Sequence, residues 1–308
     1  MRLALMIEGQ EGVTWEDWCA LADACEEHGV GTLFRSDHYI SQGDEAHNVA
    51  HDAWTTIAAL AARTSTLRFG TLVSPATFRA PALLANAAAT ADHVSGGRIE
   101  LGLGAGWMER EHRAYGFPFP ETTTRVEMLA EQLEIVHRLW TEERVDFRGR
   151  HYTLEDAPAQ PKPVQKPRPP LLVGGSGGRG TVEPALRFAD EYNTPFVSPD
   201  EAGAIREKTR PLRFSVMTGF LAGDTHEEMR ERANALYSRR PREQSFDDWL
   251  AAYSERCVVG SVDEVVERLR AYEHAGCDRV MLQHLLHTDL EPVRLIGREL
   301  APALAQSF

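Results

Sequence analysis

Residues 67–103 read LRFGTLVSPATFRAPALLANAAATADHVSGGRIELGL, and this stretch decides the fold class. It holds two short apolar runs, Leu67–Val73 and Ile99–Leu103, separated by the amphipathic segment Pro81–Val94. Short runs of this kind predict strands, and a proline suits the first turn of a helix. Two consecutive strands joined by a helix pair in parallel through a right-handed crossover. The stretch therefore predicts one β–α–β unit of an α/β protein.

The same alternation continues in both directions along the chain. Further strands are expected at Arg2–Ile7, Thr32–Arg35, Leu171–Val173, Glu191–Asn193, Arg213–Phe220 and Arg279–Gln283. Further helices are expected at Thr14–His28, Asp52–Thr64, Arg125–Trp140, Thr181–Phe188, Thr225–Leu236, Val262–Ala275 and Leu290–Leu304. The first of these helices has Thr14 as its N-cap and Asp17 at the third helical position, a form of capping box.

Eight strands that alternate with helices fit either a closed barrel or an open doubly wound sheet. The alternation runs evenly to the C-terminus, and no GxGxxG follows the first strand, as a dinucleotide-binding open sheet would require. We therefore predict a (β/α)8 TIM barrel with a Pro-rich insertion before strand five. That insertion, Val145–Pro170, contains six prolines and is expected to be an irregular excursion over the surface. With no linker or internal repeat, residues 1–308 are expected to form one domain.

Composition and charge exclude several classes of protein. The net charge of −13 argues against a nucleic-acid binder, which needs a basic surface. No apolar run approaches the length of about 20 residues that a membrane helix needs, and the apolar run at residues 3–7 is too short for a signal peptide. Four scattered cysteines show no metal-ligand spacing and suit a reducing compartment. We expect a cytoplasmic protein without membrane or nucleic-acid partners, whose tryptophans, Trp249 among them, pack in the core.

In such a barrel the functional side chains lie at the carboxyl ends of the strands and in the loops that follow. This rule selects Glu8, Asp37, His38, residues 71–74, 104–107, 174–179, 193–196 and 283–287. Of these, Asp37 and His38 are candidates for catalysis, because histidine exchanges protons near neutral pH and a neighbouring carboxylate can orient its ring. A structural pair at the barrel mouth is an equal alternative. Glu8, Gln283 and His284 are candidates for a substrate pocket.

The glycine-rich loop at residues 174–180, GGSGGRG, is the most readable of these segments. It follows a strand and precedes a helix, so its backbone N–H groups and the helix N-terminus can face an anion. The expected phosphate-binding residues are Gly174, Gly175, Ser176, Gly177, Gly178 and Arg179. The alternative is a flexible loop without a ligand. At residues 102–107, GLGAGW, small residues leave room for a flat ring beside Trp107, although close packing explains them equally well.

A metal site has little support in the sequence. His47 and His51 are four residues apart, as in some zinc sites, but no third ligand has a matching spacing. Glu109 and Glu111 lie near His112 without forming a ligand motif. We therefore expect no metal.

The segment from Leu101 to Trp107, followed by Glu111-His112, Tyr115-Gly116 and Pro118-Phe119, resembles the luciferase-like monooxygenase superfamily. Further matching motifs cover nearly the whole chain: Ser36-Asp37-His38, TFRAP at 77–81, DHVSGGR at 92–98, PKPVQKP at 161–167, Val173-Gly174-Gly175, FADEYN at 188–193 and Val259-Gly260-Ser261. Within that superfamily, the sequence most resembles the short F420-dependent oxidoreductases.

The resemblance implies roles for several residues. A non-proline cis peptide at about Leu72-Val73, in a bulge after Thr71, would back the deazaflavin ring, with Asp37 and His38 near it. Gly104, Ala105, Gly106 and Trp107 would line the ring or the tail, and the 174–178 loop would hold the phosphate, with Asn193 and Thr194 nearby. One departure is Trp107, which stands where the sugar-phosphate dehydrogenase branch has a catalytic Glu; Glu109 is a substitute for it in the substrate pocket. The resemblance also hints at a homodimer.

The favoured function is hydride transfer between coenzyme F420 and a small organic substrate. The alternatives are a monooxygenase that uses reduced FMN and dioxygen, a non-enzymatic flavin- or deazaflavin-binding protein, and a metal-dependent barrel hydrolase.

Overall fold

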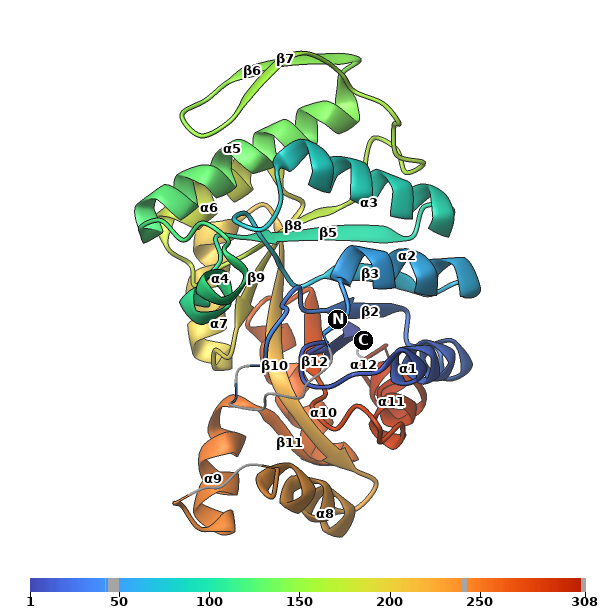
Figure 1. The fold of residues 1–308 in the computed structure, drawn as a ribbon. Coiled ribbons are helices and arrows are strands. Elements are labelled where there is room, and N and C mark those ends of the chain that lie inside the picture. The colour runs from blue at the N-terminus through green and yellow to red at the C-terminus, as the bar shows by residue number, and fades with distance from the viewer. Residues whose placement is uncertain (42, 44–49, 240–242, 306–308) are drawn as a thin grey trace.

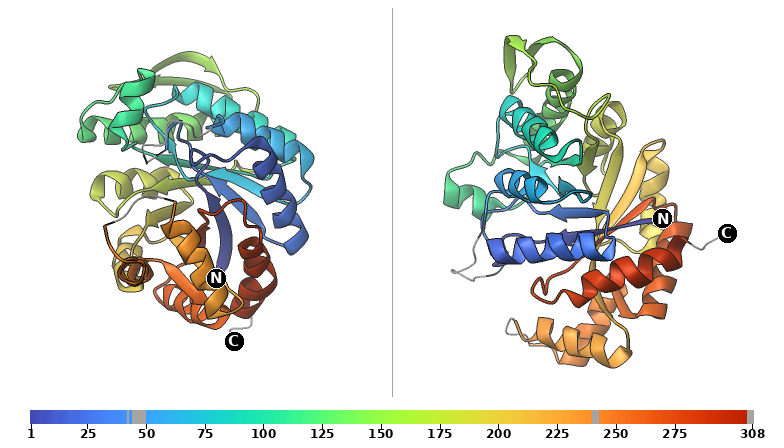
Figure 2. Two further views of the ribbon diagram at one scale, coloured as in Figure 1. Left: turned by 60° about the horizontal axis from the view of Figure 1, so that its bottom comes forward. Right: turned by 90° about the vertical axis from the view of Figure 1, so that its right-hand side faces the viewer.

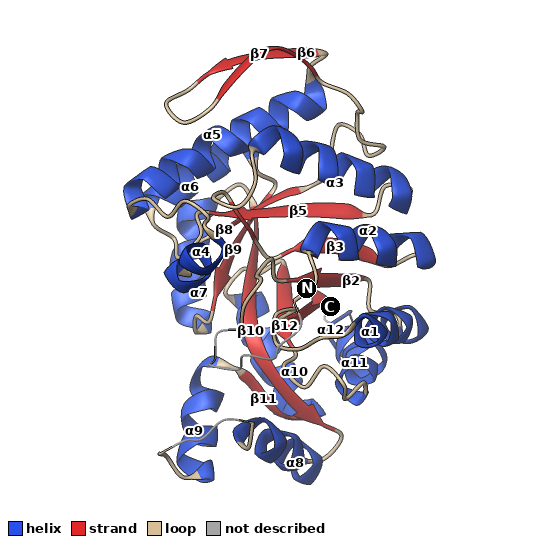
Figure 3. Ribbon diagram, in the orientation of Figure 1, coloured by secondary structure: helices blue, strands red, loops and turns tan. Residues whose placement is uncertain are grey.

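Eight parallel strands form a closed ring in the computed structural model, which describes residues 1–41, 43, 50–239 and 243–305. In ring order they are β1 (Arg2–Ile7), β2 (Thr32–Arg35), β3 (Arg68–Thr71), β5 (Ile99–Gly104), β8 (Leu171–Gly174), β9 (Glu191–Pro195), β10 (Arg213–Gly223) and β12 (Arg279–Gln283). The pairing of β12 with β1 closes the ring. The strands lie in the middle of the molecule with helices around them (Figures 1 and 3). The predicted (β/α)8 barrel is confirmed.

The helices pack around the strands, most of them on the outside of the ring (Figure 2). They are α1 (Trp15–His28), α2 (Ala53–Arg63), α3 (Pro81–Ser95), α4 (Glu109–Tyr115), α5 (Thr122–Thr141), α6 (Arg179–Phe188), α7 (Pro199–Thr209), α8 (His226–Tyr237), α9 (Phe246–Arg256), α10 (Val262–His274), and α11 (Glu291–Leu295), which continues through a π-turn at Ile296–Leu300 into α12 (Ala301–Ala305). Thr14 caps α1 in a capping box with Asp17, as predicted. Within the described residues, no helix combines the length and apolarity needed to cross a membrane.

The Pro-rich insertion is not wholly irregular, and here the sequence prediction was wrong. Strands β6 (Arg144–Arg148) and β7 (Thr153–Pro158) pair as an antiparallel hairpin that lies over α5 (Figure 1). Val145 is fully buried there, which anchors the hairpin, and the prolines begin only where β7 ends. Cis peptide bonds precede Pro161 and Pro167 in the segment that leads back to the barrel.

Five further elements were missed by the sequence reading: α4, α7, α9, the short strand β4 (Ser74–Pro75) and β11 (Val258–Ser261). Strand β11 pairs with the far end of β10, which extends well beyond the ring. Helix α7 did have a start signal in the sequence, because Ser198 caps it and Glu201 completes a capping box around Pro199.

The side chains inside the barrel form a charged layer and, above it, an apolar layer. At the amino ends of the strands, Arg279 donates hydrogen bonds to the carboxylates of Glu191 (2.8 and 3.1 Å) and Glu100 (2.9 Å). All three residues are at most 4% exposed. Above them an apolar layer of side chains separates this cluster from the other end of the barrel; it contains Ala4, Met6, Phe34, Leu72, Leu172, Met217 and Met281. The polar, open end is therefore the one at the carboxyl ends of the strands.

Arg279 stabilises both carboxylates of this layer and is stabilised by them. Burial opposes ionisation of Glu100, but the charges and hydrogen bonds of Arg279 and Arg68 outweigh it, so that the pKa of Glu100 is lowered. The same contacts raise the pKa of Arg279 against its own burial. Removing the arginine would leave two carboxylates close together in a dry interior.

We therefore expect Arg279→Met to lower the free energy of unfolding by about 3–5 kcal/mol, measured by urea denaturation at neutral pH. Because the folded-state pKa of Glu100 is lowered, its stabilising contribution is present above the unfolded-state pKa and is lost as pH falls through the folded-state value. The difference between variant and wild type should thus shrink in acid. Arg63→Met, which breaks the exposed Arg63–Asp23 pair, is the control and should change stability little. An equal loss in both variants would refute the role of the buried cluster.

Candidate active site

A cavity of about 1090 Å³ opens at the carboxyl ends of the barrel strands. One half of its lining is rich in glycine and comes from β5, β8, the loops after them and the first turn of α6: Gly104, Ala105, Gly106, Trp107, Gly174, Gly175, Ser176, Gly178 and Gly180. The other half is built of side chains from β1, β10, β12 and the α8–α9 region. Because β5 and β8 stand across the ring from β12 and β1, the two halves face each other. His38 lines the cavity from the end of β2, between the halves.

The floor of the glycine half is shaped by close contacts to Val73. A Cβ atom on Gly104 would lie 2.5 Å from the Val73 side chain, and one on Gly174 would lie 3.0 Å from it. A Cβ on Gly102, two residues before Gly104 on β5, would collide with the carbonyl oxygen of Thr71. The peptide bond between Leu72 and Val73 is cis, which confirms the expected geometry at this position. Leu72 and Val73 both line the cavity, whereas Thr71 lies behind them, bonded to the Gly102 carbonyl.

The glycine-rich loop leads into α6 at the rim of this half. Gly178 is the N-cap of the helix, and no side chain caps the first turn. The loop is fixed from β9, because Tyr192 accepts a hydrogen bond from the Gly177 amide (2.9 Å) and the Asn193 carbonyl accepts one from the Gly175 amide (2.9 Å). In the first turn of α6 the Thr181 amide donates to the Gly178 carbonyl, whereas the amides of Arg179 and Gly180 have no side-chain cap, and such amides can bind an anion.

His38 is held by a carboxylate that the sequence reading did not select. Its Nδ1 lies 2.8 Å from Oε2 of Glu111, which is fully buried on α4. The other Glu111 oxygen accepts hydrogen bonds from the backbone amides of Tyr39 and Ile40, so that one carboxylate fixes both the ring and its loop. The Nε2 atom makes no hydrogen bond with the described residues, and His38 is one of the residues that line the cavity. Trp107 lies edge-on to this ring, with centroids 5.8 Å apart.

The surroundings of His38 favour its protonated form. Burial alone would lower the pKa of the imidazole. The hydrogen bond and charge of Glu111, together with the more distant charges of Glu8 and Asp37, outweigh burial, and the pKa of His38 is raised above its ordinary value. With Nδ1 engaged by Glu111, Nε2 is the nitrogen that can exchange a proton with a molecule in the cavity.

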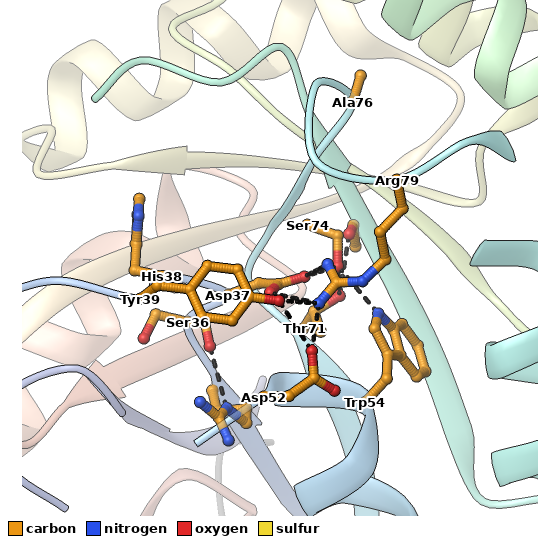
Figure 4. A network of polar contacts seen from close by, with 12 residues as sticks. Ser36, Asp37, His38, Tyr39, Asp52, Trp54, Thr71, Ser74, Ala76 and Arg79 are labelled. Atoms are coloured by element: carbon orange, nitrogen blue, oxygen red, sulfur yellow. Dashed lines mark hydrogen bonds and ion pairs between the residues drawn. The ribbon is translucent and has the colours of Figure 1, made fainter. Parts of the chain in front are cut away.

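Asp37, the residue before His38, points elsewhere (Figure 4). It is buried beneath the loop and receives two hydrogen bonds from Arg79 (2.6 and 3.1 Å) and one from Ser74 (2.6 Å). Arg79 also binds Asp52 (2.7 Å) and the hydroxyl of Tyr39 (2.9 Å). This network ties the end of β2 to β4 and to the start of α2. Asp37 does not line the cavity, and its contacts are those of a residue that positions the loop.

A second polar chain runs beneath the cavity from β12 to β2. Glu8 accepts hydrogen bonds from the side-chain amides of Gln283 (2.5 Å) and Gln10 (2.9 Å), one at each carboxylate oxygen. The Gln10 oxygen in turn accepts a hydrogen bond from Ser36 (2.5 Å). Glu8, Gln283 and Ser36 all line the cavity. The chain provides a fixed row of polar groups on the floor between the two halves.

The structure gathers most of the residues selected from sequence around one cavity, but not all. Those selected residues that do not line it are Asp37, Thr71, Ser74, Gly177, Arg179, Thr194, Glu109, His284 and Leu286. Arg179 is 87% exposed and pairs with Glu183, and Glu109 pairs with Arg113 on the exposed side of α4. His284 is buried against the Asp289 carbonyl, and burial lowers its pKa to about 4. His47 lies outside the described residues, so the His47–His51 pair has no described geometry.

Sequence reasoning missed Glu111 and most of the second half of the cavity. Leu236, Arg239, Trp249 and Tyr253 come from the α8–α9 region, which has no barrel-strand pattern to mark it. Trp249 was expected to be a core residue; it is indeed buried, but it also faces the cavity. Helical spacing alone cannot distinguish these two roles.

Comparisons with known proteins agree with this architecture. The family model described as luciferase-like monooxygenase matches residues 3–279. An F420-dependent glucose-6-phosphate dehydrogenase from Nakamurella multipartita is 38% identical over 329 residues, covering 92% of this chain and 91% of that protein. An FMNH(2)-dependent dimethylsulfone monooxygenase from Pseudomonas putida is 28% identical over 292 residues, covering 83% and 79%.

Among solved structures, the monooxygenase RslO1 from Streptomyces bottropensis superposes with a TM-score of 0.81 at 22% identity, with 99% of each chain covered. This likeness concerns the fold, whereas the family match spans most of the sequence. The chain therefore belongs to the luciferase-like monooxygenase family of enzymes.

Proposed function

We propose that this chain is an oxidoreductase that transfers a hydride between coenzyme F420 and a small organic substrate. The observation that carries the proposal is His38, which lines a cavity with a glycine floor. Its Nδ1 is fixed by buried Glu111, and its Nε2 makes no hydrogen bond with the described residues. The 38% identical F420-dependent relative supports the choice of cofactor. A homodimer and a cytoplasmic location, both expected from sequence, stay predictions.

The residues of the glycine half fit a flavin-like cofactor. Glycines at 104 and 174 leave a flat space over Val73 that a Cβ at either position would narrow. At the rim, the uncapped first turn of α6 at Gly178 suits a phosphate. Leu72, Val73 and residues 104–107 would hold the ring, and residues 174–178 with Asn193 would hold the tail. When bound, the deazaflavin supplies the site that accepts or donates a hydride.

The protein supplies proton exchange and orientation. For reduction of a carbonyl or imine, the substrate gains a hydride at carbon and a proton at its oxygen or nitrogen, and Nε2 of His38 gives that proton. In the oxidising direction, Nε2 accepts it. The raised pKa of His38 favours the donor role near neutral pH. Glu111 then compensates the charge of the imidazolium, and the Asp37–Arg79 network keeps the loop in place.

A second candidate is a monooxygenase that uses reduced FMN and dioxygen. The specific observation in its favour is the P. putida relative, whose name states that cofactor. The same glycine floor and helix N-terminus would suit FMN, so the two candidates differ in cofactor preference rather than in architecture.

Equilibrium titration of the purified protein with F420 and with FMN tests the proposal directly. We expect F420 to bind with a Kd in the micromolar range or below and FMN to bind at least about tenfold more weakly, a difference of about 1.4 kcal/mol. Absorbance and fluorescence of each chromophore report binding. The reverse preference would assign the FMN-dependent function instead, and failure of both to bind would reject both candidates.

The phosphate site at α6 can be tested with Gly178→Asp. No atom lies within 4 Å of a Cβ at this position, so the side chain fits, and aspartate is a favoured N-cap. Its carboxylate would occupy the first-turn amides and repel a phosphate. We expect cofactor affinity to fall about tenfold or more while the melting temperature stays equal or rises. Gly178→Asn, which caps without charge, is the control and should weaken binding less. Unchanged affinity in Gly178→Asp would rule out this phosphate site.

The influence of Glu111 on His38 can be measured without a substrate. In protein labelled with ¹⁵N-histidine, an NMR titration should give a pKa for His38 above the ordinary value of about 6.5. Glu111→Gln keeps the shape of the side chain but removes its charge, so the pKa of His38 should fall. The signal is assigned by its absence in His38→Asn. An unchanged pKa in Glu111→Gln would contradict the proposed electrostatic coupling.

A further inference from the structure

The half of the cavity opposite the glycine floor has a different chemical character. Its lining consists mainly of large apolar and aromatic side chains: Met217, Leu236, Trp249, Tyr253, Leu285 and, beside β9, Phe196. They come from β10, the α8–α9 region and the loops after β9 and β12. Because the glycine half is the part suited to a cofactor, this second half is where another molecule would meet it.

Trp249 and Tyr253 form an aromatic wall on this side of the cavity, and their contacts fix its position. Trp249 and Tyr253, one turn apart on α9, stack with centroids 5.2 Å apart and planes at 28°. The Tyr253 hydroxyl rests on β10 at Gly219, where any Cβ would collide with it. In register, Gly219 lies beside Gln283, which holds Glu8. The hydroxyl of Tyr253 and the Gln283–Glu8 hydrogen bond therefore lie at paired positions of β10 and β12.

The charges of the described residues in this half do not suit a phosphate or another strongly anionic group. Among the described residues that line the cavity, Arg239 is the sole arginine and lysine is absent; its Nη1 donates to the Leu285 carbonyl (2.5 Å). Burial lowers the pKa of His287, which favours its neutral form. Glu8 and Glu11 contribute carboxylates to the same lining. A dianion placed here would meet carboxylates and lose its hydration with few cations in return.

The nearby helix N-termini are also occupied by acidic groups of the chain itself. Helix α7 is capped by Ser198 and has Asp200 and Glu201 in its first turn. Helix α9 is capped by Ser245, with Asp247 and Asp248 in its first turn. Such ends do not attract an external anion. The uncapped end of α6, by contrast, belongs to the glycine half.

From this contrast we propose that the substrate is an uncharged, largely apolar or aromatic molecule with one polar reacting group, and not a sugar phosphate. Its apolar body packs against Trp249, Tyr253 and Leu285. Its polar group lies toward the floor, within reach of His38. That the bound molecule is the substrate rests on the proposed function; the chemical class of the ligand rests on the lining alone. The substrate class then differs from the glucose 6-phosphate in the name of the N. multipartita relative.

Three probes test the ligand class: the aromatic ketone 2-acetonaphthone, its charged counterpart 2-naphthyl phosphate, and glucose 6-phosphate. Binding is measured by saturation-transfer NMR and calorimetry on the wild type and on Gly178→Asp, in which the phosphate site at α6 is filled. We expect the ketone to bind at least about tenfold more tightly than 2-naphthyl phosphate in Gly178→Asp. Glucose 6-phosphate should not displace it. Equal or tighter binding of either phosphate in that variant would overturn the proposal.

Leu285 provides a variant that locates the binding site. It is partly exposed, lies in the loop after β12 and offers its side chain to the cavity. Leu285→Glu should weaken ketone binding about tenfold or more, because it replaces apolar contact with a charge, whereas Leu285→Met should change it little. The melting temperature of each variant reports folding. If ketone affinity is the same in all three proteins, the ketone does not bind against this wall and the proposal fails.

The outcomes separate this inference from the proposed function. If F420 and FMN both fail to bind but the ketone binds with the expected preferences, the redox function is rejected and the ligand class stands. If F420 binds but the ketone shows no saturable binding, with or without F420 present, the redox function stands and the ligand class is rejected.

Discussion

The steric closeness of β3, β5 and β8 on the inside of the barrel determines the shape of the candidate site. At Gly102 a side chain would strike the Thr71 carbonyl, and at Gly104 and Gly174 it would strike Val73. The absence of side chains at these positions lets three neighbouring strands approach while leaving a flat surface at the barrel mouth. The strands on the opposite side present larger side chains to the cavity, so the two halves of the lining differ in side-chain size. Both the cofactor proposal and the proposed ligand class follow from this asymmetry.

His38 sits where these two halves meet, and two carboxylates with different tasks secure it. Glu111 contacts the ring itself and raises its pKa. Asp37 is saturated by Arg79 and Ser74, so it holds the loop without touching a ligand. A carboxylate adjacent in sequence to a histidine thus serves the scaffold, while one from 73 residues away raises the pKa of the ring.

This division explains which parts of the site were predictable from sequence. Strand positions predicted from short apolar runs, such as Arg2–Ile7 and Arg279–Gln283, agree with the structure, and the barrel rule then placed His38, Glu8 and Gln283 at one end. Glu111 could not be identified, because its pairing with His38 depends on how α4 folds back across the barrel mouth. The cavity-lining role of the α8–α9 residues could not be predicted for a related reason. These residues follow helical spacing, which predicts burial but not what they are buried against.

The asymmetry of the cavity also bears on how one family can contain enzymes with such different named substrates. The glycine half tolerates little change, since even a methyl group at 102, 104 or 174 meets backbone or Val73. The α8–α9 wall is attached to the extension of β10 beyond the ring, through its pairing with β11, and can vary without disturbing barrel closure. Substrate preference can therefore diverge in the wall while the floor is retained. On this view, similarity over the whole chain is a better guide to the cofactor than to the substrate. The substrate depends instead on the individual residues that line the wall.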